Sequence, residues 1–250
     1  AKPPVVFAYK TIPHHCIDFV HPREPFTVAK YKQCAQKAIS VIARRKMIPI
    51  LVGGTGFYIQ AVVDNITLPK VPPNLKLRKR LEKISTEELF MVLQKLDPNR
   101  AASIDAKNPR RLIRAIEIAT TLGKVSVAKK QSPYDILLIG IKKPDVKLKA
   151  AIAKRSKKLI LGLVKEIKLL RKLKISQQRI RELGFEYHII RGSTSYNYMR
   201  LNLVYFAEQL AQENWHYAKR QMTWFKRDKR IRWIKTKKDA EQIVRIFLKN

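Results

Sequence analysis

The chain has 250 residues, enough for one large domain or for a domain that carries an insertion. Hydrophobic residues make up 46% of it, which favours a folded globular protein over a disordered one. Its 53 Lys and Arg residues against 19 Asp and Glu residues give a formal net charge of +34. A charge of this size repels itself unless a polyanion screens it, so we expect nucleic acid to be the principal partner.

Membrane association is disfavoured by the same sequence. The cationic residues are spread along the chain and are not concentrated on one amphipathic helix. No apolar run approaches the ~18 residues of a transmembrane helix, and the first residues lack the apolar segment of a signal peptide. Cys16 and Cys34 lack the spacing of a metal site, so we expect ordinary thiols in a reducing, cytoplasmic compartment.

The first expected elements are a short buried strand at Val5–Ala8 and a helix that begins near Pro25. Between them lies the segment Pro13-His-His-Cys-Ile-Asp18. Adjacent histidines on an extended chain point to opposite faces, so this pair does not easily supply two ligands to one metal ion. A histidine that packs locally and bonds to Asp18 is the preferred interpretation.

The stretch Pro49–Tyr58 organises the rest of the chain. Ile48–Val52 is a short apolar run, which predicts a buried strand, and the sequence Gly-Gly-Thr-Gly follows it. Glycines let the backbone turn sharply and let a ligand approach, while Phe57–Val63 resumes a helical pattern. The turn would then offer backbone N–H groups and a helix N-terminus to an anion. A plain strand-to-helix turn is equally compatible, and no Lys-Ser/Thr pair follows to make a Walker motif.

After a proline-rich break, Leu75–Leu96 is helical and strongly charged, which suits an inserted helical subdomain. The next helix begins at Asn108, and its three arginines share much of one face. They are Arg110, Arg111 and Arg114. Guanidinium groups clustered in this way suit phosphates, and solvated surface charges are the alternative.

The remaining expected elements are strands at Asp135–Ile141 and Arg230–Ile234 and helices at Pro144–Lys174, from Tyr198 onward and at Ala240–Phe247. The segment Tyr217–Asp228 interleaves Lys and Arg with Trp224 and Phe225. This combination suits RNA phosphates and bases, and an aromatic core beside a solvated charge run is the alternative.

Four segments together resemble one family, the tRNA dimethylallyltransferases, also called tRNA isopentenyltransferases. Pro13–Asp18 is similar to the family's Pro-His-His-x-Ile-Asp motif, and Pro49–Tyr58 matches Pro-Ile-Leu-Val-Gly-Gly-Thr-Gly-x-Tyr. Asn108–Ile118 matches Asn-x-Arg-Arg-x-x-Arg-Ala-x-Glu-Ile, and Lys219–Arg227 resembles Lys-Arg-Gln-x-Thr-Trp-Phe followed by two basic residues. They occur in the family's order and cover nearly the whole chain.

The resemblance implies a P-loop-type parallel α/β sheet flanked by helices, with a helical insertion subdomain. Residues 1–68 and 109–250 would form the catalytic core with the C-terminal helices, and residues 69–108 would contact the anticodon stem-loop of tRNA. The implied reaction moves a dimethylallyl group from its diphosphate to the exocyclic amine of the adenosine 3′ of the anticodon, with magnesium as cofactor. The partners are then tRNA and dimethylallyl diphosphate, with no membrane, and we expect a monomer.

The same resemblance assigns roles to individual residues. Thr55 would contact the target adenine, which must leave its stack, and Arg155 would lie near the diphosphate, whose departure needs fixed positive charge. The expected diphosphate pocket consists of Gly53, Gly54 and Gly56. The expected tRNA contacts are Arg110, Arg111, Arg114, Gly184, Lys219, Arg220, Gln221, Thr223, Trp224 and Lys226. No residue is assigned as a metal ligand.

Two parts of the family pattern are missing. The glycine-rich phosphate loop should follow the first strand, but Tyr9 follows Ala8 directly, and the Asp-Ser-x-Gln-x-Tyr segment with its general-base aspartate is absent. Around Arg155 the family often has acidic residues where this chain has Ala153 and Lys157. The sequence is therefore either an interrupted part of a longer active enzyme or a shortened homologue that binds tRNA without catalysis.

The first explanation is favoured, because the chain after Ala8 is too short for a crossover helix. A third class, a P-loop kinase of small molecules, is disfavoured. Its Walker motif is absent, and the net charge calls for a polyanion.

Overall fold

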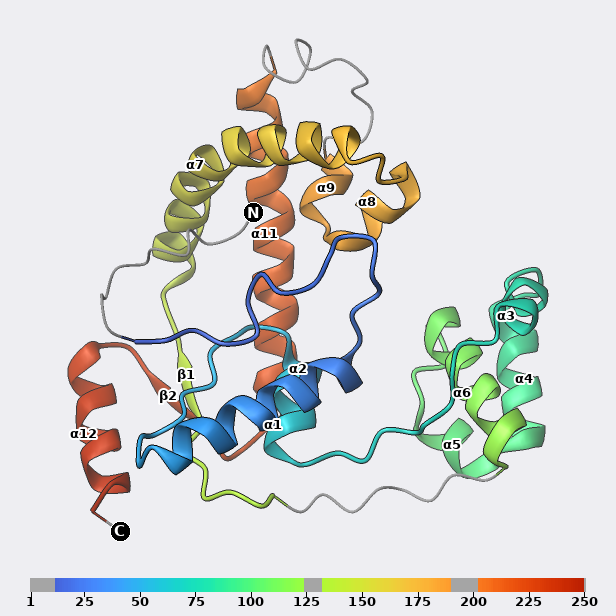
Figure 1. The fold of residues 1–250 in the computed structure, drawn as a ribbon, viewed down its shortest axis with the longest axis horizontal. Coiled ribbons are helices and arrows are strands. Elements are labelled where there is room, and N and C mark those ends of the chain that lie inside the picture. Colours follow the sequence, from blue (N-terminus) through green and yellow to red (C-terminus); the bar gives the residue numbers. More distant parts are fainter. Residues whose placement is uncertain (1–11, 124–131, 190–201, 250) are drawn as a thin grey trace. The chain divides into compact units, whose positions relative to one another are not determined.

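The computed structural model describes residues 12–123, 132–189 and 202–249. The chain folds as two compact units, one formed by Ala1–Val63 with Pro133–Asn250 and the other by Asp64–Ser132 (Figure 1). The strand expected at Val5–Ala8 lies outside the described residues. The first unit contains α1 (Val28–Arg44), α2 (Gly56–Val63), β1 (Ile139–Ile141), α7 (Asp145–Lys172), α8 (Gln177–Leu183), α9 (Glu186–Ile189), α11 (Leu203–Phe225), β2 (Arg232–Ile234) and α12 (Lys237–Phe247).

The core of the first unit lies between the long helices α7 and α11, with α8 and α9 packed against them (Figure 1). The helix predicted from Pro144 to Lys174 is confirmed as α7, and its Leu163, Ile167 and Leu170 are buried. From α11, Phe206, Ala207 and Leu210 complete the cluster. The apolar residues of both helices recur at helical spacing, which places them on the faces that meet.

The sheet that the structure describes has two parallel strands, β1 and β2, in the register Ile139↔Arg232, Gly140↔Trp233 and Ile141↔Ile234. Gly140 is required here, because a Cβ would overlap the ring of Trp233. The predicted strands at Asp135–Ile141 and Arg230–Ile234 are thus confirmed, although the paired parts are shorter. The fold is helix-rich with a small parallel sheet.

The prediction of a buried strand at Ile48–Val52 is wrong. The segment has no strand assignment, and Ile50 and Val52 are 78% and 86% exposed. Its apolar, β-branched composition favours a strand, but a strand also needs a hydrogen-bonded neighbour. Among the described residues no such neighbour pairs with this segment, because the ladder joins β1 and β2 only.

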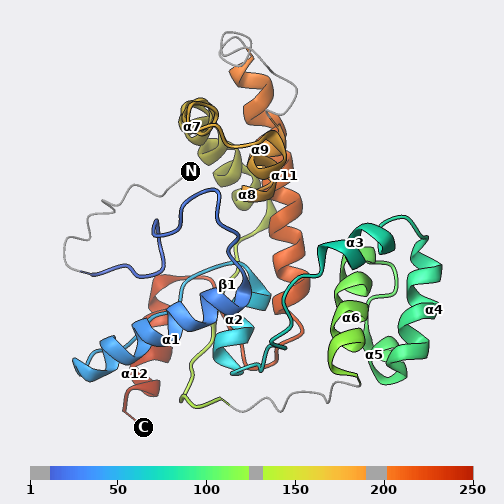
Figure 2. The same cartoon turned by 45° about the vertical axis from the view of Figure 1, so that its right-hand side comes forward.

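The second unit is helical and consists of α3 (Leu75–Leu81), α4 (Thr86–Leu96), α5 (Pro98–Ser103) and α6 (Pro109–Leu122). Figure 2 shows α4 and α6 side by side, and their contact forms a core from Leu89, Leu93, Leu112 and Ile116. The sequence had ended the insertion at residue 108, whereas this unit continues to Ser132. The difference arises because α6 packs its apolar face on α4.

Side-chain caps set the helix starts in this unit. A capping box of Ser85 and Glu88 separates α4 from α3, where the sequence had suggested one helical region. Asn108 accepts a hydrogen bond from the Arg111 N–H, and Pro109 occupies the first turn of α6.

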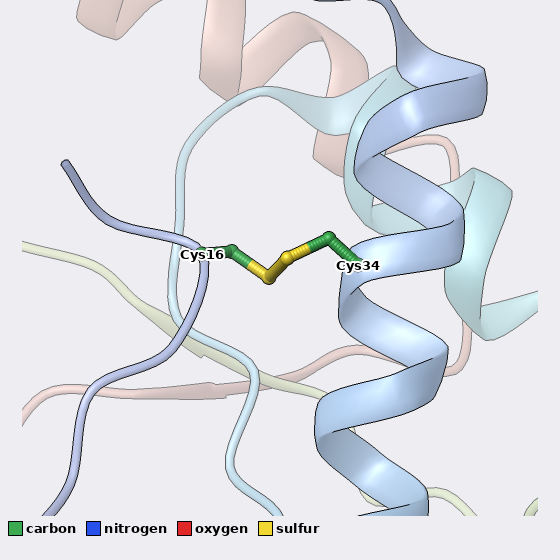
Figure 3. Close-up of a disulfide and its surroundings, with 2 residues drawn as sticks. All are labelled: Cys16 and Cys34. Atoms are coloured by element: carbon green, nitrogen blue, oxygen red, sulfur yellow. A yellow bond between two sulfur atoms is a disulfide. The ribbon is translucent and has the colours of Figure 1, made fainter. Parts of the chain in front are cut away.

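Cys16 and Cys34 form a disulfide that joins the segment before α1 to that helix (Figure 3). Their Cα atoms are 6.2 Å apart, within the range that a disulfide spans. The expectation of two free thiols is therefore wrong in this structure, because α1 brings together cysteines that are 18 residues apart in the sequence. A reducing compartment can no longer be inferred from them.

Within the three described ranges, no helix combines the length and the apolar character needed to cross a membrane.

Candidate functional site

The glycine turn at residues 53–56 packs against the C-terminal part of α11. Gln221 Nε2 donates a hydrogen bond of 3.1 Å to the carbonyl oxygen of Gly54. One turn earlier on α11, the hydroxyl oxygen of Tyr217 lies 3.4 Å from Oγ1 of Thr55. Tyr217, Gln221 and Trp224 are spaced four and three residues apart, so they share one helical face. The structure thus brings together residues that are more than 160 positions apart.

Close packing explains two of the glycines. A Cβ on Gly54 would overlap the side-chain amide of Gln221, and a Cβ on Gly56 would overlap the indole ring of Trp224. At Gly53 the nearest atom would be Ile59 Cδ1 at 3.8 Å, an ordinary contact. Gly54 and Gly56 therefore let α11 approach the turn, while the side chain of Thr55 remains exposed.

Three of the predicted tRNA contacts are exposed cations: Lys219 and Arg220 on α11, and Lys226 at its C-cap. The guanidinium carbon of Arg220 lies 5.8 Å from the ring centroid of Tyr217, a cation–π distance. Thr223 donates its hydroxyl hydrogen to the Lys219 carbonyl at 3.1 Å, so this group is used within the helix. The cationic surface therefore adjoins the residues that hold the glycine turn.

Arg155 lines a pocket of about 210 Å³. The pocket walls come from α7, the α8–α9 region and α11, and consist of Leu159, Leu163, Leu183, Glu186, Tyr187 and Leu210. Burial, followed by the nearby negative charge of Glu166, raises the pKa of Tyr187, so its hydroxyl keeps its proton at neutral pH. Gly184 directly follows Leu183 at the end of α8. An exposed guanidinium beside leucine side chains can bind a molecule with an anionic head and a short apolar tail.

Tyr217 connects this pocket region to the glycine turn. Its ring centroid lies 5.6 Å from that of Phe185, which is next to Gly184. Leu210 precedes Tyr217 by seven residues on α11, or about 10 Å along the helix axis. Tyr217 is not among the site residues predicted from the sequence. Its spacing of four residues before Gln221 was the signal that could have found it.

The three arginines of α6 differ in their surroundings. Arg114 donates to the Glu117 carboxylate and to the Val71 carbonyl at 2.8 Å. Arg111 lies 3.7 Å from Asp105, and Arg110 is exposed and makes no ion pair with another described residue. All three arginines were predicted to contact tRNA. Arg110 fits this role best, because the Arg114 guanidinium already bonds to Glu117 and Val71 within its own unit.

Glu117 is the centre of this arrangement, and its side chain is fully buried. Burial alone would raise its pKa, but hydrogen bonds from Arg78, the Asn74 backbone N–H and Arg114 outweigh burial and lower the pKa to about 2. The Arg78 bonds measure 3.0 and 2.8 Å. The Glu117 carboxylate is therefore ionised, and its hydrogen bonds connect α6 to α3 and to the segment before α3.

Among residues 12–123, 132–189 and 202–249, no group of three His, Cys, Asp or Glu side chains could hold a metal ion. Mg²⁺ commonly binds through one or two carboxylates together with substrate phosphates, so the expected magnesium does not require such a group. His14 bonds instead to the Ile12 carbonyl oxygen at 3.0 Å.

The fold and the site define the class of protein: a basic, helix-rich chain with a small parallel sheet, in which the cationic helix α11 holds a glycine turn. Comparison with known families gives the particular assignment. The family model described as IPP transferase matches residues 1–228, so the chain belongs to the IPP transferase family.

Named relatives and solved structures agree with this assignment. The tRNA dimethylallyltransferase of Anoxybacillus flavithermus is 37% identical over 232 residues, covering 89% of this chain and 72% of the relative. That of Pelotomaculum thermopropionicum is 36% identical over 241 residues, covering 92% and 75%. The tRNA isopentenylpyrophosphate transferase of Bacillus halodurans has a TM-score of 0.60 at 31% identity, covering 95% of this chain and 77% of that one. A eukaryotic dimethylallyltransferase acting on tRNA shares the fold, with a TM-score of 0.67 at 21% identity over 86% of this chain and 56% of that chain.

Proposed function

We propose that this protein transfers a dimethylallyl group from dimethylallyl diphosphate to the exocyclic amine of the adenosine 3′ of the anticodon in tRNA. Family membership and relatives named tRNA dimethylallyltransferase support this activity. The observation that carries it is the docking of the glycine turn on α11, which leaves Thr55 exposed and within 3.4 Å of the Tyr217 hydroxyl, while Arg220 lies over the Tyr217 ring.

The target base is received at Thr55. A base inside a loop must leave its stack before its amine can react, at a cost of a few kcal/mol that contacts with the protein offset. An exposed hydroxyl can hydrogen-bond to an edge of such a base. Lys219, Arg220 and Lys226, together with the insertion helices of the second unit, then bind the surrounding phosphates of the anticodon stem-loop.

The prenyl diphosphate is received at Arg155. The guanidinium group pairs with diphosphate oxygens, while Leu159, Leu163 and the other leucines of the pocket contact the five-carbon chain. In the reaction the bond from the first prenyl carbon to the diphosphate oxygen breaks, and its electron pair leaves with that oxygen. A bond from the same carbon to the amine nitrogen forms, and the amine releases one proton to water. Fixed positive charge at Arg155 stabilises the departing diphosphate.

The finer parts of the proposal rest on family membership. They are a P-loop-type sheet that includes β1 and β2, magnesium as a cofactor, a cytoplasmic location and a monomeric enzyme.

The test compares the protein with its Thr55→Ala variant, using radiolabelled dimethylallyl diphosphate and unmodified tRNA. Turnover should fall far more than tRNA affinity, since one hydroxyl adds little to a contact made mainly with phosphates. Equal losses in both would count against Thr55 at the target base. If the unaltered protein binds tRNA but transfers no label, it is the inactive tRNA-binding homologue instead.

A further inference from the structure

Helix α7 carries an excess of positive charge that the proposed reaction does not use. Its 28 residues include ten Lys or Arg residues and only two acidic ones, Asp145 and Glu166. Arg155 belongs to the pocket described above, and Lys149 lies 4.9 Å from the centroid of the Trp215 ring. The other cations of α7 need a separate explanation.

Five of these lysines form one row, which we call the α7 lysine row: Lys147, Lys154, Lys158, Lys165 and Lys172. Their separations of seven and four residues correspond to two turns and one turn of helix, so they share a face. The buried residues of α7, among them Ile160, Val164 and Ile167, lie on the opposite face and pack into the core. The row is about 38 Å long at 1.5 Å per residue.

The ammonium groups of the row are available to a partner. All five residues are exposed, and none makes an ion pair with another residue of the described ranges. Aligned like charges repel one another along a helix, which disfavours such a row unless an anion screens it. A long row of lysines fits a chain of phosphates, because a lysine binds phosphate as a point charge without demanding one geometry.

Helix α7, which carries the row, and the glycine turn pack against different parts of α11. The core contacts of α7 are with Phe206, Ala207 and Leu210, near the start of α11, whereas Thr55 meets Tyr217. Figure 1 shows α7 and α2 at different ends of α11. The start of α7 lies near Trp215, where Lys149 lies over the ring, so it is the C-terminal part of the row that is remote from Thr55. An RNA whose modified loop sits at Thr55 must therefore extend beyond that loop to reach this part of the row.

We propose that the α7 lysine row binds phosphates of the tRNA body outside the anticodon arm. This inference rests on the proposed function, since it takes tRNA as the polyanion and assigns the anticodon arm to the Thr55 site and the insertion. An anionic membrane is the less suitable partner. Between the first and last lysines of the row, the large exposed apolar residues of α7 are Leu161 and Leu169, and the continuous apolar face is buried.

The test replaces all five lysines of the row by glutamine and measures binding to two RNAs, a full-length tRNA and its isolated anticodon stem-loop, across a salt series. Affinity for the full-length tRNA should fall about tenfold or more, and the slope of log affinity against log salt should decrease by roughly 0.7 to 0.9 for each phosphate that the variant no longer neutralises. Affinity for the stem-loop and prenyl transfer to it should remain unchanged.

A matched control carries five other exposed lysines changed to glutamine, Lys229, Lys235, Lys237, Lys238 and Lys249, which removes the same charge elsewhere. It should lose little affinity for either RNA. Equal losses in both variants would show a general charge effect and overturn the proposal, as would unchanged tRNA binding in the row variant. Equal losses for the full-length tRNA and the stem-loop would also overturn it, by placing the row at the anticodon arm.

Two further measurements separate the remaining outcomes. Circular dichroism of the row variant should match that of the unaltered protein, because the replaced side chains are exposed. Cosedimentation with phosphatidylserine vesicles that depends on the row, without an effect on tRNA, would assign α7 to a membrane and overturn the proposal. If the unaltered protein transfers no dimethylallyl group, the proposed function fails, but the comparison of the two RNAs still tests the row.

Discussion

The hydroxyl oxygens of Thr55 and Tyr217 lie 3.4 Å apart, although the two residues are 162 positions apart in the sequence. The Tyr217 ring also packs against Phe185, and the Arg220 guanidinium lies over its face. One side chain therefore touches the glycine turn, the segment after α8 and the cationic face of α11. Because the Thr55 hydroxyl is held by Tyr217, the Thr55 side chain samples fewer rotamers than a free threonine side chain.

Replacing Tyr217 by phenylalanine should lower turnover while leaving tRNA affinity nearly unchanged. The ring keeps its packing, and only the hydrogen bond that orients Thr55 is removed. Such a bond contributes about 0.5–1.5 kcal/mol, which corresponds to roughly a two- to tenfold change in turnover. Steady-state kinetics with saturating tRNA would measure it.

Tyr205→Phe, an exposed position on the same helix, is the control and should have no effect. Thr55→Ala and Tyr217→Phe should not be additive when combined, because both remove one interaction. Full additivity of the two effects would show that Tyr217 does not act through Thr55.

The packing of the glycine turn on α11 predicts different outcomes at neighbouring glycines. Gly54→Ala should reduce the free energy of unfolding by about 1–3 kcal/mol, since the new Cβ displaces the Gln221 amide and breaks its hydrogen bond to the turn. Gly53→Ala meets only an ordinary contact and should be nearly neutral. Urea unfolding curves of the two variants test this, and equal destabilisation would contradict the docked turn.

Helices whose apolar residues repeat locally could be predicted from the sequence. The helical region expected at Pro144–Lys174 is observed as α7, Asp145–Lys172, and the helix expected from Asn108 begins at Pro109. Both the repeat and the cap are local signals, so they carry the information needed.

Features that depend on distant partners could not be predicted in the same way. The apolar run at Ile48–Val52 suggests burial, but composition does not say whether a neighbouring strand is present. The contact of Gln221 with Gly54 and the pairing of Cys16 with Cys34 depend on how helices pack. Resemblance selected Thr55, Gln221 and Trp224, yet the packing of Gln221 and Trp224 on the glycines that flank Thr55 is a result of the tertiary structure.

The ionised Glu117 should make the helical unit sensitive to acid. Its folded-state pKa of about 2 is below the ordinary value of 4.5, so the unfolded chain binds the proton more tightly. The stabilisation is therefore complete above about pH 5 and is lost as the pH falls toward 2, amounting to roughly 3 kcal/mol.

Hydrogen exchange of the α6 amides between pH 5 and pH 2.5, corrected for intrinsic rates, would measure this loss. Glu117→Gln should be less stable at pH 7, because Arg78 and Arg114 lose their charged partner, and its stability should depend less on pH in this range. The same pH dependence in both proteins would show that another group is responsible.

The disulfide predicts a response to reductant. Breaking the Cys16–Cys34 bond releases an 18-residue loop and should lower the free energy of unfolding by about 3 kcal/mol in the chain-entropy treatment. Thermal unfolding with and without dithiothreitol tests this, with Cys34→Ser as a control that should not respond. Two free thiols detected in the untreated, denatured protein would contradict the bond.

The arginines of α6 should separate into RNA-binding and structural residues. Arg110→Ala should weaken tRNA binding and reduce its salt slope by about one, while thermal stability remains unchanged, because the side chain is exposed. Arg114→Ala should instead lower stability, since the Val71 carbonyl and Glu117 lose their donor. Filter binding across a salt series and thermal unfolding, applied to both variants, distinguish the two roles. If Arg114→Ala lowers the salt slope as much as Arg110→Ala and leaves stability intact, the guanidinium leaves its internal partners to bind RNA, and the division between the two arginines is wrong.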